Sequence, residues 1–107
     1  MASSKEYLHF VLGQLSDLEG ITYRAMMGEY IIYYNGKIVG GIYDDRFLVK
    51  PVKSAIEYMR TVSYELPYSK GKKMLLVDEI DDRKYLQGLL NVMYDELLMP
   101  KPKKGDF

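Results

Sequence analysis

One histidine and two groups of neighbouring carboxylates are the residues of this sequence that could support acid–base or metal chemistry. A serine nucleophile needs a base within hydrogen-bonding distance, usually a histidine, and His9 is the single histidine of the chain. The apolar residues on either side of His9 repeat with helical spacing, and His9 falls beside this apolar stripe. We therefore predict that His9 faces solvent or the edge of the core, and we predict no catalytic residue.

The two carboxylate groups are better explained by a turn and a helix end than by a metal site. Asp44-Asp45 separates two runs of strand-forming residues, where aspartate is a common turn residue. The run Asp-Glu-Ile-Asp-Asp at 78–82 resembles a calcium loop only loosely, because such a loop needs oxygen ligands at alternate positions around a glycine. We interpret this run as a helix cap that complements the helix dipole. Cysteine and glycine-rich phosphate-binding motifs are absent from the sequence, which predicts neither a metal nor a cofactor.

Lysine clusters and tyrosines are the remaining candidates for a binding function. The segments 70–73 (Lys-Gly-Lys-Lys) and 101–104 (Lys-Pro-Lys-Lys) have the composition of phosphate-contacting arms. The chain has 15 basic and 15 acidic residues, so no overall field draws it to nucleic acid or to an anionic membrane, and direct DNA binding is disfavoured. Tyrosine can stack on bases or anchor a protein partner. Packing in a half-buried sheet is nevertheless the favoured role of Tyr30, Tyr33, Tyr34 and Tyr43.

Helices are predicted at both ends of the chain, around a block of strands. Lys5 to Leu18 carries apolar residues at helical spacing, and Ser54 to Val62 could form a second, short helix. Asp81 or Asp82 is expected to cap a third helix. Its apolar stripe consists of Leu86, Leu89, Leu90, Met93 and Leu97.

The central block carries the short-range marks of antiparallel hairpins. Asn35-Gly36 is typical of a type I′ turn, in which both central residues have positive φ, so Tyr30 to Tyr34 should pair with Lys37 to Tyr43. Asp44-Asp45 should then turn the chain back into a strand from Phe47 to Lys50.

Glycines at two places indicate irregularities in the predicted sheet, and one later segment adds a strand to it. Gly28 lies between two strand-like runs and indicates either a tight turn or a bulge. Gly40-Gly41, inside a predicted strand, indicates a bulge or a side chain packed over the bare backbone. Met74 to Val77 is a short apolar run that suits a buried strand of the same sheet.

These elements predict an α+β fold in which an antiparallel sheet is covered by helices on one face, in the order α-β-β-β-β-α-β-α. Residues 1–99 are expected to form a single domain, and residues 100–107 a mobile tail, because the tail has no periodicity. No apolar run reaches the ~18 residues of a membrane span and no signal peptide is recognisable, so we expect a cytoplasmic protein.

The hairpin block also resembles a known family. Its residue order is similar to the N-terminal domain of the TfoX/Sxy family of regulators of bacterial competence genes, over roughly residues 5 to 98. The matching pieces are Arg24-x-Met26-x-Gly28, Tyr33-x-Asn35-Gly36-Lys37, Asp44-Asp45 and Leu48-x-Lys50. The resemblance implies a two-layer fold of the secretion-chaperone-like type. The chain departs from the family at Met27, where an aromatic is common, at Glu29, where a second glycine is common, and in stopping before a C-terminal domain.

The resemblance, taken together with the zero net charge, leads us to expect a non-enzymatic regulatory binding module that acts on transcription through protein contacts and not by reading DNA itself. Family members work with a cyclic-AMP receptor protein, so the implied partner is a transcription factor or polymerase. The alternative is a structural or chaperone-like domain that self-associates, for example as a homodimer, or holds a peptide.

We expect any interaction site in the hairpin block, because this block carries more of the family pattern than packing alone requires. The simplest alternative role for Arg24 and Lys50 is cross-strand charge pairing with Glu29 and Asp45. The predicted interaction residues are Arg24, Gly28, Tyr33, Asp45 and Lys50.

Overall fold

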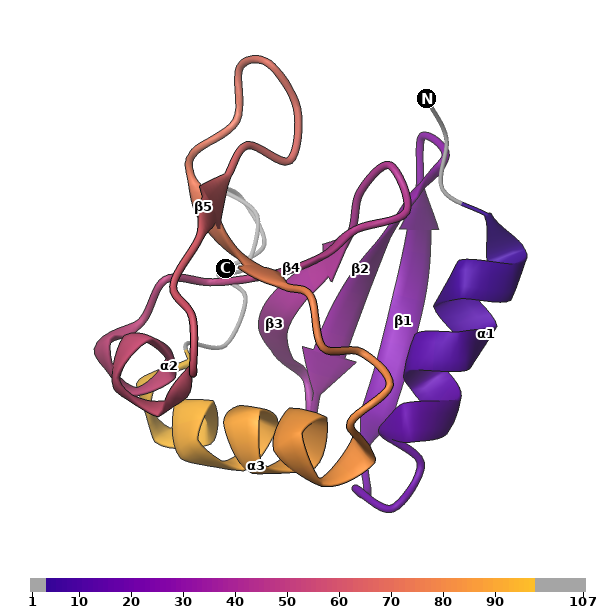
Figure 1. The fold of residues 1–107 in the computed structure, drawn as a ribbon. Coiled ribbons are helices and arrows are strands. Elements are labelled where there is room, and N and C mark those ends of the chain that lie inside the picture. The colour runs from indigo at the N-terminus through magenta and orange to yellow at the C-terminus, as the bar shows by residue number, and fades with distance from the viewer. Residues whose placement is uncertain (1–3, 98–107) are drawn as a thin grey trace, which may run out of the picture.

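The computed structural model describes residues 4–97, which form one six-stranded antiparallel sheet and three α-helices (Figure 1). The helices are α1 (Lys5–Gln14), α2 (Lys53–Tyr58) and α3 (Arg83–Met93), and a 3-10 turn, η1 (Tyr94–Glu96), follows α3. The strands are β1 (Ile21–Met26), β2 (Glu29–Tyr34), β3 (Lys37–Ile42), β4 (Phe47–Val49), β5 (Tyr64–Glu65) and β6 (Met74–Val77). Their order across the sheet is β1-β2-β3-β4-β6-β5. The structure therefore confirms the predicted α+β fold.

Three two-residue turns connect the first four strands. The central residues have positive φ in every case: 52° and 84° at Met27-Gly28, 50° and 83° at Asn35-Gly36, and 53° and 54° at Asp44-Asp45. Two positive φ angles give the turn the twist that suits an antiparallel hairpin. The predicted turns at Asn35-Gly36 and Asp44-Asp45 are confirmed, and Gly28 belongs to a tight turn and not to a bulge.

The sheet does contain a bulge, and it lies at Gly40. The sequence indicated either a bulge or a packed side chain at Gly40-Gly41, and the structure shows both. Ile32 pairs with Gly40 while Tyr33 pairs with Ile38, so β3 has one extra residue at this point. A Cβ atom on Gly40 would lie 2.0 Å from the carbonyl oxygen of Leu48 in β4. The next residue, Gly41, lies under an aromatic side chain, since its Cβ would be 2.9 Å from the ring of Tyr43.

The core fills the space between the helices and one face of the sheet. Figure 1 shows α3 running below the sheet, between α2 on one side and α1 on the other. The helices contribute Leu8, Val11, Ala55, Leu86, Leu89, Leu90 and Met93 to the buried cluster, and Leu15 joins it from just after α1. The sheet contributes Ile32, Val39, Ile42, Phe47, Val49, Leu75 and Val77. The predicted apolar stripe of the third helix is thus a core face, and Asp82 is its N-cap.

The first and third helices end earlier than predicted. The first helix stops at Gln14 and not at Leu18, because its last turn tightens: the Leu15 N–H donates to the carbonyls of both Val11 and Leu12. Leu15 still packs in the core, so the helical spacing of apolar residues in the sequence extends beyond the end of the helix. The third helix ends at Met93, and Leu97, predicted to lie on it, packs into the core from beyond η1.

The second helix is also shorter than predicted. It ends at Tyr58, because Met59 is already extended (φ −69°, ψ 136°), so the prediction of helix up to Val62 is wrong. The chain then forms β5, which pairs with β6 and was not predicted, since two residues give no alternation to recognise. The predicted tail at 100–107 lies outside the described residues. Within residues 4–97, no helix combines the length and apolar character needed to cross a membrane.

Candidate functional site

The face of the sheet that points away from the helices, here called the open face, carries the candidate binding site. Cross-strand partners point to the same face of a sheet. The row that crosses five strands on this open face is Arg24, Ile31, Gly41, Leu48 and Leu76. Leu48 is fully buried yet is not part of the helix-covered core cluster, so other residues must cover it on the open face.

A groove of about 720 Å³ lies on this open face, beneath the loop of residues 66–73 that joins β5 to β6. Its apolar lining includes Ile31, Ile38, Pro51, Pro67 and Met74, with Tyr43 and Tyr68. Its basic lining consists of Lys50, Lys70, Lys72 and Lys73. We call this hollow the lysine-rimmed groove. Its volume falls in the range of about 300–1,000 Å³ that is typical of ligand pockets.

Arg46 attaches the loop to the sheet. Its guanidinium forms an ion pair with Glu65 at 3.2 Å and donates a hydrogen bond to the carbonyl of Leu66 at 3.0 Å. Its Nε also donates to the carbonyl of Tyr43 at 3.2 Å. One arginine thereby joins the β3–β4 turn, β5 and the start of the loop, and fixes the wall of the lysine-rimmed groove.

Two tyrosines form the junction between the loop and the sheet. The rings of Tyr43 and Tyr68 lie 6.4 Å apart, tilted by 57°, and the Gly71 N–H donates to the Tyr68 carbonyl at 2.9 Å. Burial raises the pKa of Tyr43, and the neighbouring Tyr68 and Glu29 raise this pKa further. Tyr43 is therefore a neutral phenol at physiological pH, suited to packing and hydrogen bonding and not to acting as a base.

The structure brings only part of the predicted interaction site to this groove. Arg24 belongs to the row described above, and Tyr33 lies on the same open face, two residues along β2 from Ile31 and paired with Thr22. Of the five predicted residues, only Lys50 lines the groove. Gly28 is a turn residue. Asp45 lies by the start of α1, where its Oδ1 accepts a hydrogen bond from the Ser4 N–H at 2.7 Å.

Sequence reasoning missed the groove but did detect one of its parts. The lysines of segment 70–73 were recognised as a basic cluster, and the structure places them over the apolar sheet face. The half-buried positions of Tyr33, Tyr34 and Tyr43, and the burial of Tyr30, confirm that these tyrosines pack on the sheet. His9 is exposed, as predicted.

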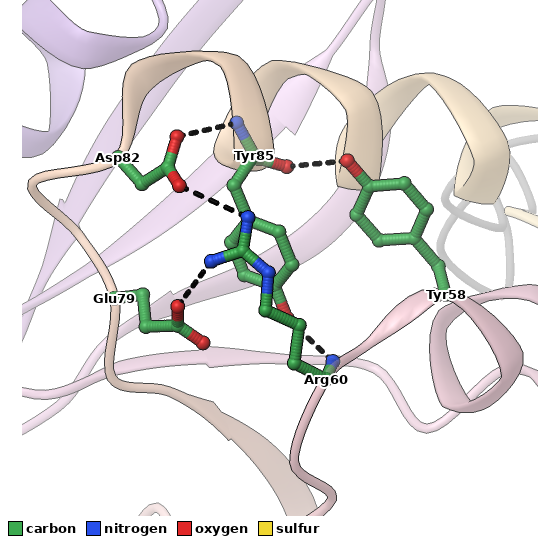
Figure 2. A network of polar contacts seen from close by, with 5 residues as sticks. All are labelled: Tyr58, Arg60, Glu79, Asp82 and Tyr85. Carbon is green, nitrogen blue, oxygen red and sulfur yellow. Dashed lines mark hydrogen bonds and ion pairs between the residues drawn. The ribbon is translucent and has the colours of Figure 1, made fainter.

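The predicted helix-capping run is part of a polar clasp between α2 and α3, shown in Figure 2. The Arg60 guanidinium lies between the carboxylates of Glu79 and Asp82, with the Asp82 contact at 3.1 Å, and its Cζ is 4.3 Å from the centre of the Tyr85 ring. The Arg60 N–H donates to the Tyr85 hydroxyl, and the Tyr58 hydroxyl donates to the Tyr85 carbonyl, both at 3.1 Å. This clasp fixes the chain after α2 against the start of α3.

Asp82 makes the clasp sensitive to pH. Its pKa is lowered first by the hydrogen bond from the Tyr85 N–H and then by Arg60. A lowered pKa in the folded state means stability that is present above the ordinary pKa of about 4 and is lost as the pH falls through the folded value. We therefore expect the melting temperature to fall in acid, and to fall less steeply in Asp82→Asn, which can still cap the helix but no longer titrates.

Thermal melts followed by circular dichroism between neutral pH and about pH 2 test this expectation. Glu96, whose pKa is lowered by hydrogen bonds from Ser54, acts in the same direction and leaves a residual slope in the variant. Equal slopes for the parent and Asp82→Asn would show that Asp82 is not a source of the acid sensitivity.

Comparisons with known proteins show which family the chain is similar to. A family model described as the TfoX N-terminal domain matches residues 13–96, a range that includes every motif of the hairpin block. A protein of Spirochaeta aurantia described as an uncharacterized 12.7 kDa protein in the trpE 5′ region is 31% identical over 106 residues. That alignment covers 98% of this chain and 92% of the relative. No solved structure matches the chain.

Proposed function

This chain belongs to the TfoX N-terminal domain family, and from that premise we propose that it is a non-enzymatic regulatory binding module that acts on transcription by contacting another protein. The partner proposed is a transcription factor or a polymerase. Regulation is the role that the family name carries, and protein contact is the mode of action that the surface of this chain supports best.

The observation that carries the proposal is the lining of the lysine-rimmed groove. Its residues are isoleucines, a valine, a methionine, prolines, glycines, tyrosines and lysines. This set offers apolar contact area and positive charge, the two features that hold a partner in place. A nucleophile activated by a neighbouring base would require a different set of residues.

The charge of the chain favours a protein partner over DNA. Proteins that bind DNA through its phosphates need a positive surface large enough to release counterions, whereas here 15 basic and 15 acidic residues balance. The lysines gathered at the groove surround an apolar floor, and apolar surface offers no favourable contact to the phosphates of a duplex.

Affinity purification of the tagged chain from its source cells, after cross-linking, tests the proposal. We expect a transcription factor or polymerase subunit to be enriched, and deletion of the gene to change a defined set of transcripts that the wild-type chain restores. Arg24→Ala should reduce the recovery at unchanged melting temperature if the family pattern marks a contact, because Arg24 is exposed on the open face.

Lys84→Ala is the matched control, because Lys84 is also exposed but lies on α3, which packs against the other face of the sheet. Repeated recovery of no transcription component, together with unchanged transcripts in the deletion strain, would rule the proposal out.

A further inference from the structure

We propose that the lysine-rimmed groove binds an acidic peptide segment with aliphatic side chains at its centre, supplied by the partner protein. The inference rests on the proposed function, since it names the chemistry of the contact that this function requires. Three observations carry it: the shape and apolar floor of the groove, the sign of the charge around it, and the kind of aromatic surface that it offers.

The floor of the groove is formed by apolar residues that the fold leaves partly uncovered. Ile31 in β2 and Ile38 in β3 lie on the open face and are only half-buried, although the same strands bury Ile32 and Val39 completely beneath the helices. Tyr68, on the overhanging loop, is 62% exposed and borders the same hollow. Covering such apolar surface is favourable by about 25 cal/mol per Å², so the floor is a site for aliphatic side chains.

The charge around the groove has one sign. Lys50 enters from the end of β4, and Lys70, Lys72 and Lys73 enter from the loop, while no carboxylate is among the lining residues. Among residues 4–97, the cations of the ion pairs are arginines, at positions 46, 60 and 83. The four lysine ammonium groups can therefore meet the carboxylates of a bound segment without first breaking an ion pair within the described chain.

The aromatic surface argues against a single-stranded nucleic acid as the occupant. Bases bind to such faces by stacking on exposed aromatic rings in succession. The ring of Tyr43 is packed over Gly41 and against Tyr68, which leaves Tyr68 as the exposed ring of the groove, above a floor of isoleucine. Aliphatic side chains fit this floor better than bases do.

A fluorescence anisotropy titration tests the proposal with defined probes. The first probe is a labelled peptide with three central aliphatic residues and two aspartates at each end. The second has lysine in place of aspartate, the third has serine in place of the aliphatic residues, and the fourth is an oligothymidylate. We expect the first peptide to bind at least about tenfold more tightly than the other three, and its binding to weaken as salt is raised.

Two pairs of charge reversals locate the site. Lys70→Glu with Lys72→Glu should weaken binding of the first peptide by at least about tenfold. Lys5→Glu with Lys84→Glu changes the net charge equally at two exposed positions on α1 and α3, and should leave the affinity within about twofold. All four lysines are exposed, so melting temperatures should stay close to the parent value.

Each contrary result has a defined meaning. Equal loss in both pairs, or equal binding of the acidic and basic peptides, would overturn the proposal, and so would tighter binding of oligothymidylate. If no peptide binds although transcription components still co-purify, the groove proposal fails and the proposed function stands. If the acidic peptide binds as expected but deletion changes no transcript, the groove proposal stands and the proposed function fails.

Discussion

Replacing Gly40 by alanine should lower the free energy of unfolding by about 3 kcal/mol, the upper end of the usual range for overpacking. The new Cβ would lie 2.0 Å from the carbonyl oxygen of Leu48 and 2.6 Å from the Cα of Val49. Both atoms belong to the backbone of β4, so no change of rotamer can relieve the clash. The strands β3 and β4 would have to separate at the centre of the sheet, where the order β2-β3-β4-β6 places them.

Gly13→Ala is the control for this prediction. Gly13 lies inside α1, and a Cβ there would meet nothing within 4 Å. Because glycine in a helix costs about 0.5–1 kcal/mol relative to alanine, the same substitution should stabilise the protein at this position. Urea unfolding of both variants measures the two effects. A Gly40→Ala variant that unfolds at the same urea concentration as the parent would show that β3 and β4 do not approach as closely as described.

Replacing Phe47 by alanine should cost about 3–5 kcal/mol. Phe47 is the largest of the fully buried side chains, and it lies on β4 between its cross-strand partners Ile42 and Val77. Removing its ring would leave a cavity between the sheet and the helices, at a place where strands on both sides restrict collapse. This loss is a large fraction of the ~5–15 kcal/mol that stabilises a typical domain.

Phe10→Ala provides a matched substitution, because Phe10 is 47% exposed on α1. It should change the free energy of unfolding by no more than about 0.5–1 kcal/mol. Calorimetric or circular dichroism melts should thus separate the two phenylalanine variants by more than about 10 °C. Similar melting temperatures for the two would mean that Phe47 does not fill the core.

Elements with local chemical signals could be predicted from the sequence, and elements formed by distant residues could not. The turn at Asn35-Gly36 was predictable because both residues suit positive φ, and the start of α3 because Asp82 can cap its own helix. The clasp of Arg60 could not be predicted, since its partners Glu79 and Tyr85 lie 19 and 25 residues away. The strand β5 was missed because it exists only by pairing with β6.

The candidate site likewise has parts that could be predicted from the sequence and parts that could not. The family pattern in the hairpin block pointed to Gly28 and Asp45, whose places in the structure are a tight turn and the start of α1. The lysine-rimmed groove combines Ile31, Lys50 and the loop of residues 66–73, which come together only when β6 crosses back beside β4. A lysine cluster can be recognised in a sequence, but the surface beneath it cannot.

The three two-residue turns also keep the entropic cost of loop closure low for the first four strands. Joining β1 to β4 requires closing only very short connections, each biased toward closure by residues with positive φ. Placing β6 beside β4 requires closing the whole segment from residue 50 to residue 73, and the entropic cost of closure rises with the logarithm of loop length. Four of the six strands are therefore joined by contacts that are local in the sequence, and local contacts form fastest. The first four strands can serve as a template on which β6, and with it the loop over the groove, is assembled last.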